Sequence, residues 1–309
     1  MCSIKILVTY KDKHRVLKSD ILTPIQTGRA IADEKFEKMI GDDTGDNVST
    51  YNPFLCEMSA LYWAWKNYDK LGNPDYIGHM HYRRQFLFDT SNLKLKHRWL
   101  SSYYKFKRFT PQIIDAFSDE RIREFVPNYD YIISDWFDAT VYGHKNIRED
   151  YSKIPGAKIE IFDEFIKICK EKSPEYMEEI EQIEKGTKAL ICIMFIMKKD
   201  LFFEFCEFAF PILFELIDRI GDENLTTNGQ RYAGYMAEKL LSIYVLKLQK
   251  NKQLKMKILN CSFMLNPDET FLQSILNSIF SIKKTSDNHI NITILGVKIK
   301  VKIKGNSIK

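Results

Sequence analysis

Short apolar runs mark three places where the chain is expected to form buried strands. Residues 4–9 are apolar and rich in β-branched side chains, and they end where residues 11–20 become polar. Residues 76–80 and 129–134 are also compatible with strands, and each leads directly into charged side chains. Because ligands bind at the carboxyl ends of parallel strands, we expect residues 1–150 to form an α/β part with a ligand site at that edge.

Apolar residues take a helical period in two other regions. After Asn52, which can cap a helix, and Pro53, which suits a first turn, apolar side chains recur at helical spacing as far as Tyr68. The same period returns later, so residues 151–246 are expected to be mostly helical. Within them, the continuous apolar run at residues 189–197 predicts a buried strand and is far shorter than the ~20 residues that span a bilayer.

The last part of the chain, residues 247–309, is expected to form a basic helix followed by a β-hairpin. Asn266 and Pro267 can start the helix, and residues 290–303 alternate apolar and polar positions around Gly296. The apolar face of the helix would hold Phe271, Leu272, Ile275, Leu276, Ile279 and Phe280. Twelve lysines against three acidic residues give this part a formal charge of +9, whereas the whole chain carries +5. Such a tail suits an anionic membrane surface or a contact between copies of the chain, and the alternative is an edge hairpin protected by lysines.

Composition indicates a globular protein in a reducing compartment. Hydrophobic residues make up 45% of the 309 residues, which is enough for a core. The six cysteines are scattered without a Cys-x-x-Cys pair, a pattern that predicts neither a disulfide framework nor a zinc cluster. The chain begins without the pattern of a signal peptide, so a cytoplasmic location is expected.

The segment His81-Tyr82-Arg83-Arg84 brings an imidazole and two guanidinium groups to the end of the strand predicted at residues 76–80. A guanidinium group can bind phosphate through two parallel hydrogen bonds, so the arginine pair suits a diphosphate and its stabilisation as a leaving group. The alternative is a solvated strand end with a structural histidine. The charge cluster alone leaves both interpretations open.

The segment at residues 76–84 resembles the "HYRR" segment of a bacterial family of capsular polysaccharide, exopolysaccharide and lipopolysaccharide glycosyltransferases, long known as a domain of unknown function. Other segments agree with this family in the same order: residues 23–29, 41–49 together with Asn52, 57–67, 194–199 and 231–241. The resemblance covers about residues 4–246 and leaves out the basic tail. Two departures from the family pattern are Lys11, where His is common, and Ile193, where Asn is common.

The resemblance implies a GT-A-like fold, in which a nucleotide-binding α/β sheet is joined to a mainly helical half on the acceptor side. It implies transfer of a hexose, of the galactose or galactofuranose type, from a UDP-sugar to a growing lipid-linked surface polysaccharide. The enzyme would then work at the inner face of the plasma membrane. We assign donor binding to Tyr10, Lys11, Asp46, Asn47, Ser49, His81, Tyr82, Arg83 and Arg84.

Residues 41–50 form a loop rich in turn formers and acidic groups. In it Asp46, Asn47 and Ser49 offer the hydrogen-bonding groups that a uridine or a ribose needs, although a solvated acidic loop explains the pattern equally well. The chain contains no Asp-x-Asp triplet, and Asp135-x-x-Asp138 is only a loose substitute. We therefore expect no bound cofactor, with Mn²⁺ or Mg²⁺ as the alternative.

Three carboxylates are candidates for the general base that deprotonates the acceptor hydroxyl: Glu57, Asp135 and Asp138. His81 is a further candidate for the chemistry. For Glu57 the alternative is a carboxylate that interacts with the helix dipole.

Trp63 and Arg231 are assigned to the acceptor side. Trp63 either stacks on a sugar ring or belongs to the core, and Arg231 either reaches the site or pairs with Glu238.

Two other functions of the protein stay open. Another sugar-nucleotide-dependent transferase would share the nucleotide site, and a nucleic-acid-binding protein would explain the basic tail. The chain has no nucleic-acid recognition motif, however, so no such partner is expected.

Overall fold

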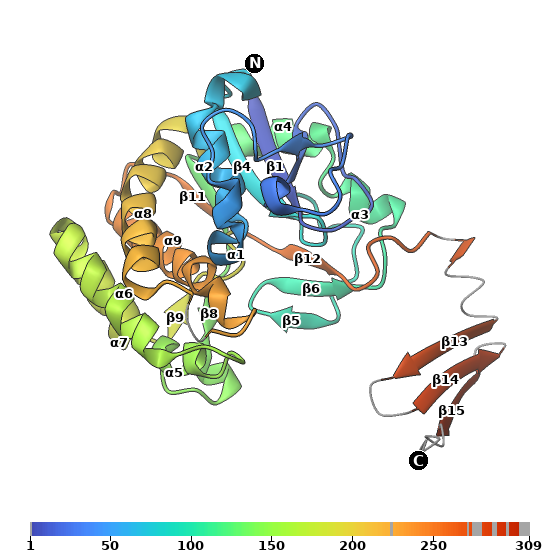
Figure 1. Ribbon diagram of the computed structural model, residues 1–309. Coiled ribbons are helices and arrows are strands. Elements are labelled where there is room, and N and C mark those ends of the chain that lie inside the picture. Colours follow the sequence, from blue (N-terminus) through green and yellow to red (C-terminus); the bar gives the residue numbers. More distant parts are fainter. Residues whose placement is uncertain are drawn as a thin grey trace, which may run out of the picture.

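A seven-stranded sheet lies at the centre of the molecule (Figure 1). The computed structural model describes residues 2–222, 225–270, 272–273, 280–285, 289–294 and 297–302. In sheet order the strands are β11 (Met256–Leu259), β7 (Tyr131–Ser134), β10 (Phe195–Lys198), β4 (Tyr76–His81), β1 (Ile4–Tyr10), β2 (Leu22–Gln26) and β3 (Ile40–Gly41). All neighbours pair in parallel except β10, which is antiparallel to β4 and to β7. The three strands predicted from apolar runs are confirmed within two residues.

Both faces of this sheet are covered, which is why its strands are apolar runs rather than alternating ones. Successive side chains of a strand point to opposite faces, so Ile77 of β4 lies in the core cluster on the helical side. Tyr76 and Met80 lie in the second core cluster, on the other side.

Helices dominate the second half of the chain, as predicted. They are α5 (Ile147–Ser152), α6 (Ile159–Lys172), α7 (Met177–Lys185), α8 (Lys199–Ile220) and α9 (Tyr232–Lys250). Helix α8 contacts β4 and β10 on one side and α6 and α9 on the other, so it links the sheet to the outer helices (Figure 1). The apolar run at residues 189–197 is not one strand: β9 (Lys188–Ala189) and β10 are separated by Cys192 and Ile193, whose φ angles are 67° and 42°.

The helix predicted from Asn52 to Tyr68 is interrupted. It forms α1 (Asn52–Leu55) and α2 (Met58–Lys66), because Cys56 adopts a φ of 52° between them. The side-chain amide of Asn52 donates a hydrogen bond of 2.7 Å to the carbonyl of Cys56. Asn52 is the first residue of α1 and stabilises the break, instead of capping a longer helix.

A small sheet covers the other side of the molecule. It consists of β5 (Arg98–Leu100), β6 (Tyr103–Phe106) and β12 (Cys261–Met264), with β12 parallel to β6. Beside it lie α3 (Pro111–Asp115) and α4 (Asp119–Phe125), whose apolar residues join the second core cluster. The short strand β8 (Phe137–Asp138) pairs with β9.

The tail begins later than expected. The boundary predicted at residue 246 falls inside α9, and β11 and β12, which follow it, belong to the central and small sheets. The predicted hairpin is confirmed as β14 (His289–Ile294) and β15 (Val297–Lys302), which pair antiparallel. A third strand, β13 (Phe280–Thr285), pairs with β14, so Phe280 lies in a strand and not in the predicted helix.

Of the predicted tail helix, residues 272–273 are helical and residues 274–279 lie outside the described residues. No helix in the described part of the chain is long and apolar enough to cross a membrane.

Candidate active site

Three segments meet at one edge of the central sheet. Strands β1 and β4 run in parallel and end side by side, with Thr9 paired to His81. Strand β10 runs in the opposite direction, so the loop at Cys192 and Ile193 that precedes it reaches the same edge. The sheet therefore brings together residues that lie far apart in the sequence.

The backbone turns back immediately after β4. His81 and Arg84 exchange two backbone hydrogen bonds of 3.1 Å, which place Tyr82 and Arg83 at the tip of a tight turn. The side-chain amide of Gln85 donates to the carbonyl of His81 at 2.8 Å, and this hydrogen bond stabilises the turn. The four residues singled out in the sequence thus project from a rigid corner.

Both arginine side chains rest on aromatic rings. The guanidinium carbon of Arg83 lies 5.0 Å from the ring centre of Phe263, and that of Arg84 lies 5.3 Å from the same ring and 5.5 Å from Trp99. The Nε atom of each arginine is buried without a hydrogen-bond partner. Among the described residues, neither guanidinium forms an ion pair. The two positive charges are therefore held in place without being neutralised by direct contacts.

Acidic groups act on Arg84 from a greater distance. Burial works against its charge, yet Cys192 and Tyr103, followed by the carboxylates of Glu57 and Glu238, hold the pKa of Arg84 above its usual value. Arg84 stays charged while remaining available to an anion.

His81 is a neutral hydrogen-bond donor in this arrangement. Burial, followed by the charge of Arg84, lowers the pKa of His81 to about 3. Its Nε2 lies 2.6 Å from the carbonyl oxygen of Cys192, a contact that requires the proton on this nitrogen, and 3.7 Å from the Oε1 atom of Glu57. The Nε2 proton of His81 is therefore engaged by the carbonyl of Cys192.

His79, two residues earlier in β4, is also buried and neutral. It is fully buried between the hydroxyl of Thr9, 3.1 Å from Nε2, and the carbonyl of Ile193, which contacts Nδ1. Burial lowers the pKa of His79 to about 3. Two neutral histidines of β4 therefore hold the carbonyls of the loop before β10.

Glu238 of α9 holds this loop from the other side. Its Oε1 accepts a hydrogen bond of 2.7 Å from the backbone N–H of Cys192, and its Oε2 lies 3.2 Å from the ammonium group of Lys239. The positive φ angles of Cys192 and Ile193 are costly for residues other than glycine, so the anchoring contacts are needed to keep this backbone shape.

Arg231 does not pair with Glu238. Its Nε donates to the sulfur of Cys56 at 3.4 Å, and its guanidinium lies 5.4 Å from the ring of Tyr235. The pKa of His81 is lowered in part by the charge on Arg231. Arg231 therefore lies close enough to influence His81, and its assignment to the acceptor side stays a prediction.

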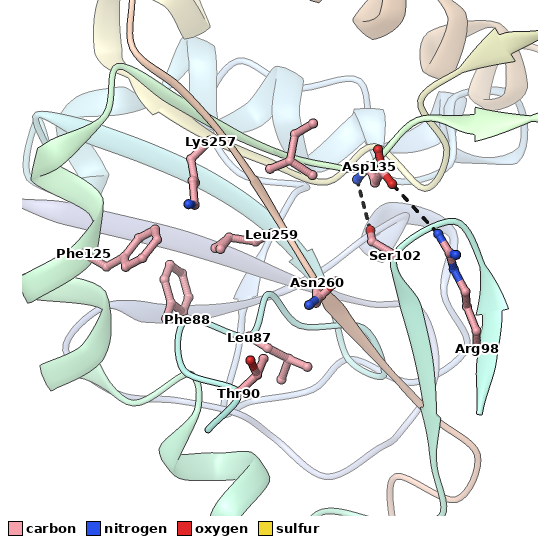
Figure 2. Close-up of a pocket in the computed structure, with 11 residues that line it drawn as sticks. Leu87, Phe88, Thr90, Arg98, Ser102, Phe125, Asp135, Lys257, Leu259 and Asn260 are labelled. Carbon is pink, nitrogen blue, oxygen red and sulfur yellow. Dashed lines mark hydrogen bonds and ion pairs between the residues drawn. The ribbon is translucent and has the colours of Figure 1, made fainter. Parts of the chain in front are cut away.

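The other two predicted carboxylates, Asp135 and Asp138, contact other residues. Asp135 follows β7 and lines a cavity of about 340 Å³, where its Oδ2 lies 3.9 Å from Arg98 (Figure 2). Asp138 accepts hydrogen bonds from the backbone and the hydroxyl of Thr140, which hold its pKa below the usual range. Of the three candidates for the base, only Glu57 lies beside His81.

The acidic loop is largely occupied by internal contacts. Asp42 is fully buried and accepts hydrogen bonds from the hydroxyls of Ser49 and Ser59, at 2.5 and 2.6 Å. Asn47 accepts from the backbone of Ser49 at 3.2 Å, and Asp46 accepts from the hydroxyl of Tyr62 at 3.2 Å. Asp46 is exposed and Asn47 is partly exposed, whereas Ser49 is buried inside the loop.

The remaining donor candidates differ in accessibility. Tyr10 is fully buried, and its hydroxyl donates to the carbonyl of Arg15 and accepts from the N–H of Leu17. Lys11 is exposed, and Tyr82 stacks face to face on His14 at 4.0 Å. Tyr82 and Lys11 therefore remain available to a ligand, whereas the Tyr10 hydroxyl is committed to the loop after β1.

Trp63 belongs to the core. Only 1% of it is exposed, and its indole N–H donates to the hydroxyl of Thr44 at 2.9 Å. The predicted stacking on a sugar ring is therefore wrong, because neither face of the indole is free.

No group of three or more His, Cys, Asp or Glu side chains suited to a metal ion occurs among the described residues.

Comparison with known proteins shows the family and the fold. Residues 5–251 match the family described as Domain of unknown function (DUF4422). The chain belongs to this family. No curated protein matches this DUF4422 chain.

The fold is also similar to a solved structure, the apo form of the bifunctional glycosyltransferase WbbM, with a TM-score of 0.77 and 31% sequence identity. The match covers 85% of this DUF4422 chain and 46% of the WbbM chain, so our chain spans about half the length of that protein. The expected GT-A-like α/β fold is thus confirmed.

Two contributors to the site were missed by sequence reasoning. Phe263 lies beyond the matched family segment in a region predicted to be a tail, and Cys192 lies in a run predicted to be one strand. Neither carries a local signal, because an isolated aromatic residue and a buried cysteine are ordinary core residues. Only the pairing of distant strands reveals them.

Proposed function

We propose that this chain is a glycosyltransferase that transfers a hexose, of the galactose or galactofuranose type, from a UDP-sugar to a growing lipid-linked polysaccharide in capsule or lipopolysaccharide biosynthesis. The observation that carries the proposal is the pair Arg83 and Arg84, which projects from the carboxyl end of β4 with buried Nε atoms that lack partners. The similarity to WbbM and the earlier sequence resemblance support the reaction class.

The arginines would bind the diphosphate of the donor. In the transfer, the acceptor oxygen forms a bond to the anomeric carbon, while the bond from that carbon to the phosphate oxygen breaks and UDP departs. Guanidinium groups placed before the reaction stabilise the charge that develops on the departing diphosphate. A divalent cation, Mn²⁺ or Mg²⁺, is the alternative for the same task.

Glu57 is our preferred general base. An inverting transfer needs a carboxylate that takes the proton of the acceptor hydroxyl. Glu57 lies 3.7 Å from His81 and is partly exposed, whereas Asp138 is engaged with Thr140. Asp135, which lines the separate cavity of Figure 2, is the second candidate.

Lys11, Tyr82, Asp46 and Asn47 are proposed to contact the donor around the arginine pair, and Arg231 is proposed to face the acceptor. The basic tail would hold the enzyme at the inner face of the plasma membrane, where lipid-linked acceptors lie. Another sugar-nucleotide-dependent transferase would use the same arginines without such an acceptor.

The test is transfer from UDP-galactose to a lipid-linked glycan acceptor by the purified protein. Replacing Arg83 or Arg84 by alanine is expected to lower kcat/KM by about 10²–10³, the cost of removing one preorganised donor to a developing anion. The matched control is Arg148→Ala, because Arg148 pairs with Asp163 on an outer helix. An Arg83→Ala variant as active as the parent would contradict the assigned role, and donor hydrolysis without transfer would favour the alternative transferase.

A further inference from the structure

The backbone beside the arginine pair is held by β12. The N–H of Met264 donates to the carbonyl of Arg83 at 2.8 Å, and the N–H of Ser262 donates to the carbonyl of Gln85 at 2.8 Å. The hydroxyl of Ser262 also bonds the side chain of Gln85 at 2.8 Å. Gln85 in turn bonds His81, so β12 is connected to both ends of the turn.

Phe263 lies between these two anchored residues, and it contacts both guanidinium groups. Its ring stacks on Trp99 with centroids 4.3 Å apart and an angle of 29° between the planes. Arg83 and Arg84 lie 5.0 and 5.3 Å from the same ring. Phe263 therefore contacts both cations, and Trp99, which stacks on Phe263, also contacts Arg84 at 5.5 Å.

An aromatic support differs from a carboxylate partner in one important respect. A carboxylate would orient a guanidinium but would also neutralise it and occupy its donors, whereas the face of a ring attracts the cation and leaves the N–H groups free. This matches the unpartnered Nε atoms of both arginines. The two guanidinium groups are therefore oriented while their N–H donors stay available to an anionic ligand.

We propose that Phe263, braced by Trp99, is a positioning residue that preorganises Arg83 and Arg84 for a diphosphate ligand. This inference rests on the proposed function, because it assigns the anion as the diphosphate of the donor. It also places part of the donor site in β12, beyond the residues that match the family.

The experiment measures binding of UDP and of inorganic pyrophosphate to the full chain by calorimetry. Phe263→Leu keeps an apolar side chain but removes the ring, and it is expected to weaken both ligands about tenfold, the combined effect of two cation–π contacts. Phe263→Tyr keeps the ring and should restore binding to within about twofold of the parent. That rescue separates positioning from a loss of packing alone.

Three further variants test the same inference. Phe203→Leu is the matched control, because Phe203 carries a cation, Lys199, at 5.6 Å but lies on α8. It should bind both ligands like the parent. In an Arg84→Ala background, Phe263→Leu should cost only about threefold, since one of the two contacts it supports is already gone. Trp99→Leu, which removes the brace, should weaken binding less than Phe263→Leu does.

The outcomes separate this inference from the proposed function. Parent-like binding of both ligands by Phe263→Leu would overturn the inference and leave the function standing. If the protein binds pyrophosphate but not UDP, and this binding depends on Phe263, the assignment of a UDP-sugar as the donor would be overturned. The positioning role of Phe263 would be supported. A parent protein that binds neither ligand would contradict both.

Discussion

At the scale of single residues, the site combines two histidines that burial keeps neutral with two guanidinium groups that lie on aromatic rings. His79 and His81 contact backbone carbonyls, and Arg83 and Arg84 contact Phe263. The histidines hold the loop at Cys192 and Ile193 against β4, and the arginines give this edge of the sheet a positive potential. The contact between His81 and the carbonyl of Cys192 favours a supporting role for His81, and a part in the chemistry stays the alternative prediction.

The neutral histidines predict a loss of stability in acid. Their pKa values of about 3 lie below the usual 6.5, so between these pH values the unfolded chain binds protons that the folded chain does not. Their contribution is complete above about pH 6.5 and is lost as the pH falls towards 3, with a slope of up to about 1.4 kcal/mol per pH unit for each histidine. Urea unfolding should give a free energy about 2–4 kcal/mol lower at pH 5 than at pH 7.

A His79→Gln variant provides the control for this prediction, because it should show about half of the pH dependence. Equal free energies of unfolding at pH 7 and pH 5 in the parent protein would contradict the assignment of neutral histidines.

At the scale of elements, the loop between β9 and β10 depends on Glu238. The carboxylate accepts from the N–H of Cys192 and has no assigned part in the chemistry. Glu238→Gln keeps an acceptor oxygen and should retain kcat/KM within a few fold of the parent. Glu238→Ala leaves the N–H unpaired and should lower the free energy of unfolding by about 1–3 kcal/mol.

Transfer rates and urea unfolding of the two variants test this role of Glu238. A Glu238→Gln variant that folds like the parent but loses transfer by more than about a hundredfold would show instead that the carboxylate serves as the base.

Sequence patterns predicted the elements but not their interruptions. The apolar runs that became β1, β4 and β7 are recognisable because both faces of the sheet are buried. The breaks at Cys56 and Cys192 were not recognisable, because a positive φ is ordinarily signalled by glycine or asparagine. Here a side-chain hydrogen bond from Asn52 accompanies the break at Cys56, and a long-range hydrogen bond to Glu238 accompanies the break at Cys192.

The candidate site was predictable in part. The segment from His81 to Arg84 carries its chemistry in consecutive residues, so the sequence displays it directly. The supports of this segment, Phe263 and Glu238, come from strands and helices more than 150 residues away. Their role follows only from the register of β12 with β6 and from the position of α9, which local patterns do not encode.

At the scale of the whole molecule, the basic tail predicts attraction to anionic lipid. In the sequence, Lys298, Lys300 and Lys302 alternate with the apolar residues of β15 (Val297–Lys302), a pattern from which one lysine face is expected. Replacing these three lysines by glutamine should weaken sedimentation with phosphatidylserine-containing vesicles by about a hundredfold, at about 1 kcal/mol for each lysine. Vesicles of phosphatidylcholine alone serve as the control.

UDP binding by the same triple variant should equal that of the parent, because the arginine site lies on the central sheet. Vesicle binding that does not change on removal of the lysines would contradict the membrane role and leave the contact between copies, or the protected edge, as the explanation of the tail.

The central claim is that Arg83 and Arg84 bind the diphosphate of the donor. Crystals soaked with UDP, in EDTA and separately in Mn²⁺, test it most directly. We expect the diphosphate oxygens within hydrogen-bonding distance of both guanidinium groups in EDTA, with no metal needed. A diphosphate that appears only with Mn²⁺ and contacts the metal instead of the arginines would contradict the account.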